Sequence, residues 1–149
     1  MAATVHASAV LADGRGVLIR GASGSGKSSL VLALLLADRA RNRLVADDRV
    51  RLAVEDGRLF AAPPQEIAGL LEVRGQGILC PPHVFRAEIA LVVDLEPAEN
   101  LSRMPAAEAR IARLEGLDLP RLALPSAAPD GWIRVLAALA FPPLELQNR

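Results

Sequence analysis

The sequence predicts an α/β fold in which a mixed β-sheet is flanked by helices, with residues 1–149 forming one domain. A chain of this length buries roughly two thirds of the surface that it exposes when unfolded, which is enough for a substantial core. Apolar residues make up 52% of the chain and aromatic residues only 3%, so the core must consist of Leu, Val, Ile and Ala. That composition is typical of a buried sheet covered by helices. A glycine-rich segment between a strand pattern and a helix pattern indicates the same fold.

Net charge, hydropathy and cysteine content exclude several classes of protein. The formal net charge is +0 and no basic stripe interleaves with aromatic residues, which argues against a nucleic-acid partner. The longest strongly apolar run, residues 30–37, is far shorter than the roughly 20 residues that span a membrane, and the N-terminus lacks a basic signal-peptide region. The one cysteine, Cys80, cannot form an internal disulfide. We therefore expect a cytoplasmic protein without membrane or nucleic-acid partners.

Residues 21–28 read GASGSGKS and match the phosphate-binding pattern G-x-x-x-x-G-K-[ST] in full. An apolar strand pattern over 16–20 precedes this P-loop, and a helix pattern over 28–39 follows it. The glycines let backbone N–H groups point at phosphate oxygens, and the helix N-terminus adds its positive dipole end. Lys27, the only lysine in the sequence, then reaches the outer phosphates, and Ser28 contacts Mg²⁺. The residues predicted to bind the nucleotide are Gly21, Ala22, Ser23, Gly24, Ser25, Gly26, Lys27 and Ser28.

Two apolar strand patterns end in acids that could serve a nucleotide site. The first ends in Asp47 and Asp48, and the second, over 89–93, ends in Asp94. By pattern alone Asp94 looks more like an ordinary Walker B acid, and spacing leaves the choice open. Because adjacent side chains of a strand point to opposite faces, we expect Asp47 and Asp48 to have different roles.

Residues 72–78 read EVRGQGI and predict a turn. Its two glycines, beside a glutamate and an arginine, allow the backbone to approach a ligand closely. The alternative interpretation is a hairpin-like turn with a surface ion pair between those two charged residues.

His6, GASGSGKS, LVADD and EVRGQGI occur in an order and spacing that resemble the catalytic C-terminal domain of HPr kinase/phosphorylase, in a short form without the N-terminal domain. The resemblance covers most of residues 4–124. It implies a nucleotide-binding core like that of phosphoenolpyruvate carboxykinase, ATP and Mg²⁺ as cofactors, and a hexameric assembly. It also implies phosphorylation of a serine in HPr or an HPr-like carrier of the phosphotransferase system, together with its removal by phosphorolysis.

The resemblance also implies individual roles. Its second metal ligand, beside Ser28, corresponds to Glu72, and its catalytic aspartate corresponds to Asp48. Its active-site histidine corresponds to His6, and an arginine before an LGL-like stretch corresponds to Arg113. Asp47 would then support Asp48 from the other side of the strand.

Two positions depart from the family pattern. Ser29 stands where the family usually has a glutamate after the P-loop serine. The family's basic loop, which serves phosphorolysis, should lie between a strand over 121–124 and a helix over 132–141, but residues 125–131 read PSAAPDG and contain no cation. The sequence therefore leaves open whether a phosphorylase activity accompanies the kinase activity.

Two other functions remain open from the residues themselves. One is a small-molecule kinase or other P-loop NTPase that uses Asp94 as its metal acid. The other is a regulator that senses ATP without turnover, although such a protein would not need a base near the γ-phosphate.

Overall fold

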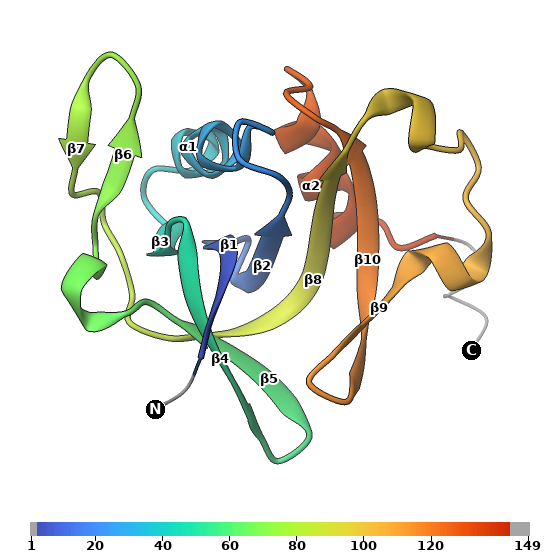
Figure 1. Ribbon diagram of the computed structural model, residues 1–149, viewed down its shortest axis with the longest axis horizontal. Helices are drawn as coiled ribbons and strands as arrows, with labels where there is room; N and C mark the ends of the chain where they lie inside the picture. Colours follow the sequence, from blue (N-terminus) through green and yellow to red (C-terminus); the bar gives the residue numbers. More distant parts are fainter. Residues whose placement is uncertain (1–2, 144–149) are drawn as a thin grey trace.

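The computed structural model describes residues 3–143 and shows a curved, mixed β-sheet with two α-helices against it (Figure 1). The strands are β1 (Thr4–Ala12), β2 (Arg15–Arg20), β3 (Arg43–Ala46), β4 (Arg49–Glu55), β5 (Arg58–Ala62), β6 (Leu71–Val73), β7 (Gly77–Leu79), β8 (Ala87–Glu96), β9 (Ile111–Leu114) and β10 (Leu117–Pro125). The helices are α1 (Lys27–Ala37) and α2 (Gly131–Ala140), with short 3₁₀ turns at Gln65–Ile67, Ala98–Asn100 and Ala107–Arg110.

The strand order of the main sheet is β2-β1-β4-β5-β8-β10-β9, with β3 paired to β1. Strand β8 also pairs with β2, in parallel, so the hydrogen-bonded path closes on itself. Strand β10 is parallel to β8 as well. The carboxyl ends of β2, β8 and β10 therefore meet at one edge of the sheet, which is where α/β proteins bind ligands.

The core has two layers that follow the alternation of the central strands. Val17 and Ile19 of β2 face α1 and α2, whereas Leu18 between them faces β4 and β5. Both helices cover the same face (Figure 1). The predicted mixed sheet is confirmed, but helices flank one face only, because the β4–β5 hairpin folds across the other.

The predicted helix after the P-loop is α1. Its inner face buries Leu30, Val31 and Leu34, while Leu36 remains 61% exposed. The helix ends at Ala37, where the buried Asn42 side chain donates a hydrogen bond of 2.7 Å to the Leu34 carbonyl and so satisfies one terminal acceptor. Within residues 3–143, no helix is long and apolar enough to cross a membrane.

The remaining sequence predictions agree with the observed elements. The EVRGQGI segment forms the antiparallel hairpin β6–β7, with Val73 opposite Gly77. The other predicted strands correspond to β2, β3, β8 and β10, although β3 ends at Ala46, before the predicted Asp47 and Asp48. The predicted C-terminal helix is α2.

Candidate active site

The P-loop connects the end of β2 to the start of α1. Gly24 and Gly26 adopt positive φ angles of 81° and 99°, a region that side chains with a Cβ rarely enter. Ser25 N–H donates to the Ala22 carbonyl at 3.0 Å, which closes the turn. At Gly21 a Cβ would lie 2.5 Å from Ser25 Oγ, so any larger residue would force the Ser25 side chain to move. The loop expected from the sequence is therefore formed by backbone conformations that its glycines allow.

Lys27 lies across the mouth of this loop. Its Nζ donates hydrogen bonds to the carbonyls of Gly21 at 2.8 Å and Ala22 at 3.1 Å, and the residue is only 7% exposed. These contacts hold a positive charge beside the backbone N–H groups that would receive a polyphosphate. An anion entering the loop would therefore meet a cation that is already in place.

The acid pair lies in the bend between β3 and β4, beyond the last residue of β3. Asp48 has a φ of 69°, and this left-handed turn sends the two carboxylates into different surroundings. The Asp48 side chain is 67% exposed, whereas Asp47 is buried. The expected difference between the two acids is present, but its cause is the turn and not strand alternation.

Asp47 connects the P-loop to strand β1 through buried and partly buried hydrogen bonds. Its Oδ1 accepts from Ser28 Oγ at 2.8 Å and from Ser8 Oγ at 2.9 Å. Ser8 Oγ in turn accepts from the Asp48 N–H at 3.1 Å. Asp47 does not itself line the cavity, so it is placed to position Ser28. The sequence analysis missed Ser8, whose only signal is a small polar residue inside the apolar strand β1.

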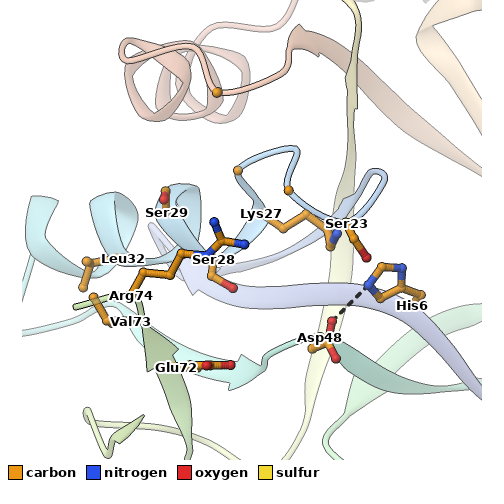
Figure 2. Close-up of a pocket in the computed structure, with 13 residues that line it drawn as sticks. His6, Ser23, Lys27, Ser28, Ser29, Leu32, Asp48, Glu72, Val73 and Arg74 are labelled. Atoms are coloured by element: carbon orange, nitrogen blue, oxygen red, sulfur yellow. Dashed lines mark hydrogen bonds and ion pairs between the residues drawn. The ribbon is translucent and has the colours of Figure 1, made fainter. Parts of the chain in front are cut away.

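Asp48 faces His6, and both line a cavity of about 510 Å³. His6 Nε2 lies 2.9 Å from Asp48 Oδ1, within hydrogen-bond distance (Figure 2). The antiparallel register of β1 and β4 creates this contact, because it pairs His6 with Arg49, the residue after Asp48. The remaining charged side chains of the cavity are Lys27, Glu72 and Arg74.

Glu72 reaches the cavity from the β6–β7 hairpin, opposite the P-loop (Figure 2). Among residues 3–143, no group donates a hydrogen bond to its exposed carboxylate. The Ser28 hydroxyl donates its hydrogen bond to Asp47, which leaves the lone pairs of its oxygen available to a cation. A hydroxyl and a carboxylate are the hard oxygen ligands that suit Mg²⁺, which proteins usually hold with one or two carboxylates plus substrate phosphates.

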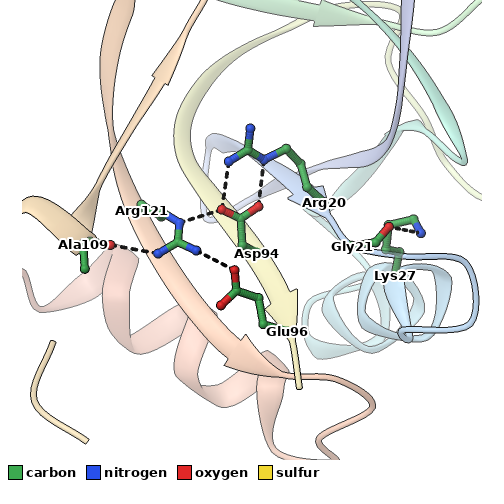
Figure 3. Close-up of polar contacts among 7 residues, drawn as sticks. All are labelled: Arg20, Gly21, Lys27, Asp94, Glu96, Ala109 and Arg121. Carbon is green, nitrogen blue, oxygen red and sulfur yellow. Dashed lines mark hydrogen bonds and ion pairs between the residues drawn. The ribbon is translucent and has the colours of Figure 1, made fainter. Parts of the chain in front are cut away.

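Asp94, the alternative metal-binding acid, is hydrogen-bonded to two arginines (Figure 3). Arg20 donates to both carboxylate oxygens at 2.7 and 2.8 Å, and Arg121 Nε donates at 2.6 Å. Burial raises the pKa of Asp94, but the hydrogen bonds from Arg20 and Arg121 outweigh it and hold the pKa below its ordinary value. Asp94 does not line the cavity. Its ion pairs with Arg20 and Arg121 connect β8 to β2 and β10.

Arg113 is not brought to the cavity. It lies on β9, where its guanidinium donates to Asp118 Oδ1 at 2.9 Å in an exposed ion pair. Arg74, which the sequence analysis did not select, lines the cavity instead. The hairpin position of Arg74 beside Glu72 was the available signal.

The PSAAPDG loop covers one side of the P-loop. Ala127 lines the cavity, adopts a φ of 57°, and donates its N–H to the Ser25 carbonyl at 2.8 Å. A Cβ on Gly26 would lie 3.2 Å from the Ala127 Cα, so the two loops are in close contact.

Comparisons with known proteins agree on one family. The family model described as HPr Serine kinase C-terminal domain matches residues 1–129. A protein of Geobacillus thermodenitrificans named HPr kinase/phosphorylase is 39% identical over 138 residues, which cover 84% of this chain and 43% of the relative. A protein of the same name from Listeria welshimeri is 33% identical, covering 99% of this chain and 50% of the relative. The chain thus spans about half the length of these curated relatives.

A solved structure shows the same fold. The structure described as the Hpr(Ser) kinase/phosphatase from Coxiella burnetii superposes with a TM-score of 0.80 at 26% sequence identity. The match covers 98% of this chain and 93% of that one.

Proposed function

Because the chain belongs to the HPr serine kinase C-terminal domain family, we propose that it transfers the γ-phosphoryl group of ATP to a serine of an HPr-type carrier protein. One observation carries the proposal: Asp48, with His6 beside it, lines the same cavity as the P-loop residues Lys27 and Ser28. A base and a triphosphate site that share one cavity are the two parts that phosphoryl transfer to a hydroxyl requires.

The P-loop and Lys27 would hold the triphosphate. The buried Lys27 ammonium supplies a point charge for the β- and γ-phosphates once it exchanges its carbonyl partners for phosphate oxygens. Ser28 and Glu72 would hold Mg²⁺, which when bound neutralises charge on the phosphate oxygens. Asp47 keeps the Ser28 hydroxyl in position from behind.

Asp48 would act on the incoming serine. Its carboxylate accepts a hydrogen bond from the serine hydroxyl, whose oxygen attacks the γ-phosphorus while the bond from that phosphorus to ADP breaks. The serine proton passes to Asp48 late in the transfer. His6 holds the Asp48 carboxylate through the contact at Oδ1, so that the second oxygen remains available to the substrate.

The exposure of this acid favours a protein as the acceptor. The Asp48 side chain is 67% exposed and that of His6 47%, so a serine on a folded partner can reach them without entering an enclosed cavity. A small-molecule kinase more often encloses its substrate in order to exclude water. The small-molecule alternative is therefore less well supported by this site.

The reverse reaction would need a second anion site for inorganic phosphate. The cavity offers Lys27 and Arg74 as cations, whereas the loop over residues 125–131 offers none. We therefore propose that the kinase direction dominates and that phosphorolysis is weak.

The wider features of the family are part of the same proposal. These are a core related to phosphoenolpyruvate carboxykinase, a cytoplasmic location, one domain over residues 1–149, and a hexamer.

A transfer assay with intact-mass detection tests the function. The chain is incubated with ATP, Mg²⁺ and a purified HPr-type carrier, beside a second carrier of the nitrogen branch and a carrier whose acceptor serine is replaced by alanine. We expect one added phosphoryl group on an intact carrier and none on the alanine variant. ATP consumption without a modified carrier would contradict the proposal and favour a small-molecule acceptor.

A further inference from the structure

A second cavity opens beside the P-loop, on the side of the PSAAPDG loop. It measures about 200 Å³ and shares Gly26, Ser29 and Ala127 with the phosphate cavity. Its other walls include Ala33 of α1, Leu95 of β8, Pro125 and Pro129 of the loop, and Trp132 at the start of α2. The two cavities are therefore adjacent at the first turn of α1.

The chemistry of this second cavity differs from that of the first. Among the described residues that line it, Ser29 contributes the only hydroxyl and none carries a charge. Trp132, which also packs against the core, and two prolines are part of the lining. Such walls suit a planar heterocycle, because aromatic side chains stack on the faces of nucleobases and do so for every base.

The position of the cavity agrees with the direction in which a bound nucleotide must run. A P-loop cradles the α- and β-phosphates with its backbone, while its lysine reaches the β- and γ-phosphates. The γ end therefore points toward Asp48, and the α end lies at the start of the helix. Ser29 is the residue that follows the P-loop there, and neither His6, Asp48 nor Glu72 lines the second cavity.

The PSAAPDG loop is held in a fixed conformation. Ser126 N–H donates to the Glu96 carbonyl at 2.8 Å, and Ala127 N–H donates to the Ser25 carbonyl at 2.8 Å. Gly131 N–H donates to the Ala128 carbonyl at 3.2 Å, which leads into α2. A cavity that is formed before the ligand arrives costs little ordering entropy on binding.

We propose that this cavity is the base subsite of a nucleoside triphosphate, with the base stacked on Trp132 and the ribose passing over Ser29. The inference rests on the proposed function, because it requires a triphosphate in the P-loop. Shape and stacking alone select the base here, so adenine and guanine nucleotides bind with similar affinity. The loop at 125–131, which contains no cation, thus supplies a surface for a base.

Trp132 makes the inference directly measurable. The chain contains one tryptophan and no tyrosine, so its tryptophan fluorescence reports on this cavity alone. We expect ATP and GTP with Mg²⁺ to quench the emission with a saturating dependence on concentration. Inorganic tripolyphosphate, which occupies the P-loop without a base, should leave the emission nearly unchanged while competing with ATP.

Calorimetric titration of variants separates stacking from phosphate binding. Trp132→Ala should weaken ATP binding by about 5- to 100-fold, the range for loss of one base–aromatic stack, and Trp132→Phe should restore much of it. Ala33→Leu, which fills the cavity and leaves the indole in place, should also weaken ATP binding. Ile133→Ala, at an exposed neighbour on α2 that does not line the cavity, is the matched control and should bind ATP like the wild type. Tripolyphosphate affinity should be the same in all four variants.

Two outcomes would overturn the inference in different ways. If Trp132→Ala and Ala33→Leu bind ATP as tightly as the wild type, the base lies elsewhere, for example against Leu32 and Val73 of the larger cavity, and the kinase proposal stands. If neither ATP nor tripolyphosphate binds to the wild type, the proposed function fails together with the subsite.

Discussion

Replacing Asp94 by asparagine tests whether this acid stabilises the fold or takes part in phosphoryl transfer. The carboxylate of Asp94 accepts hydrogen bonds from two arginines, and its side chain is only 12% exposed. Asp94→Asn removes the negative charge but leaves both guanidinium groups in place. Breaking one partner of a buried ion pair typically costs about 3–5 kcal/mol.

The expected loss is somewhat smaller than that range. The Arg20 side chain is 34% exposed and can regain water, whereas that of Arg121 is 17% exposed and keeps a contact with Glu96 at 3.1 Å. We expect a loss of about 2–4 kcal/mol, which in a chain of this size lowers the melting temperature by about 5–15 °C. Below the new transition, transfer activity should stay within a few-fold of the wild type, because Asp94 does not line the cavity.

Thermal unfolding by circular dichroism, together with a transfer assay at a temperature where both proteins are folded, measures the two effects. Asp118→Asn is the matched control, since it removes a carboxylate from an exposed arginine pair and should change stability by less than about 0.5 kcal/mol. If Asp94→Asn retained its melting temperature but lost transfer, Asp94 would act as the metal-binding acid, and the assignment of Mg²⁺ to Ser28 and Glu72 would be refuted.

Three further predictions concern the site and the ion pairs of Asp94. Asp48→Asn should lower transfer by about 10²–10⁴-fold while ATP affinity measured by calorimetry changes little; equal loss of both would contradict a base role. Ser8→Ala should lower the free energy of unfolding, measured with denaturant, by about 1–3 kcal/mol, because Asp47 loses one of two donors to its Oδ1. It should also raise the Mg²⁺ concentration needed for half-maximal transfer. An unchanged Mg²⁺ dependence would argue against this positioning role. Because the pKa of Asp94 is lower in the folded chain than the ordinary value near 4, the unfolded chain binds the proton first as the pH falls. The stability from Asp94 is therefore complete above about pH 5 and is lost below it, and the stability difference between wild type and Asp94→Asn should narrow as the pH falls from 5 toward 3; a constant difference would show that the ion pair does not carry it.

The sequence predicts most reliably those features whose geometry is local. The strand, P-loop and start of α1 are specified by glycines that permit positive φ and by an apolar helix pattern, and all three occur as expected. The EVRGQGI hairpin is specified in the same way by the glycines of its turn.

Contacts that depend on strand register could not be read from the sequence. Ser8 meets Asp47 because β1 pairs with β3, with an irregularity between Ala9 and Val10, and no local pattern encodes that pairing. Asp94 lies opposite Arg20 only because β2 and β8 are parallel neighbours in that register. The apolar run before Asp94 resembles a Walker B strand. Only the positions of the arginines beside Asp94 show that its carboxylate is already paired.

Arg113 illustrates the limit of carrying a role over by a short stretch of sequence. The segment that follows it forms the tight turn between β9 and β10, which places the arginine beside Asp118 and outside the cavity. Its expected role in catalysis therefore remains a prediction that the geometry of this chain does not support.

We propose that Asp48 directs the γ-phosphoryl group of ATP to a protein serine. Single-turnover transfer of label from γ-³²P ATP to an HPr-type carrier, with wild type and Asp48→Asn at saturating Mg²⁺, tests this role. We expect acid-stable label on a carrier serine with the wild type and almost none with the variant, although both bind ATP. Equal labelling by the two proteins, or label found only on free phosphate, would contradict it.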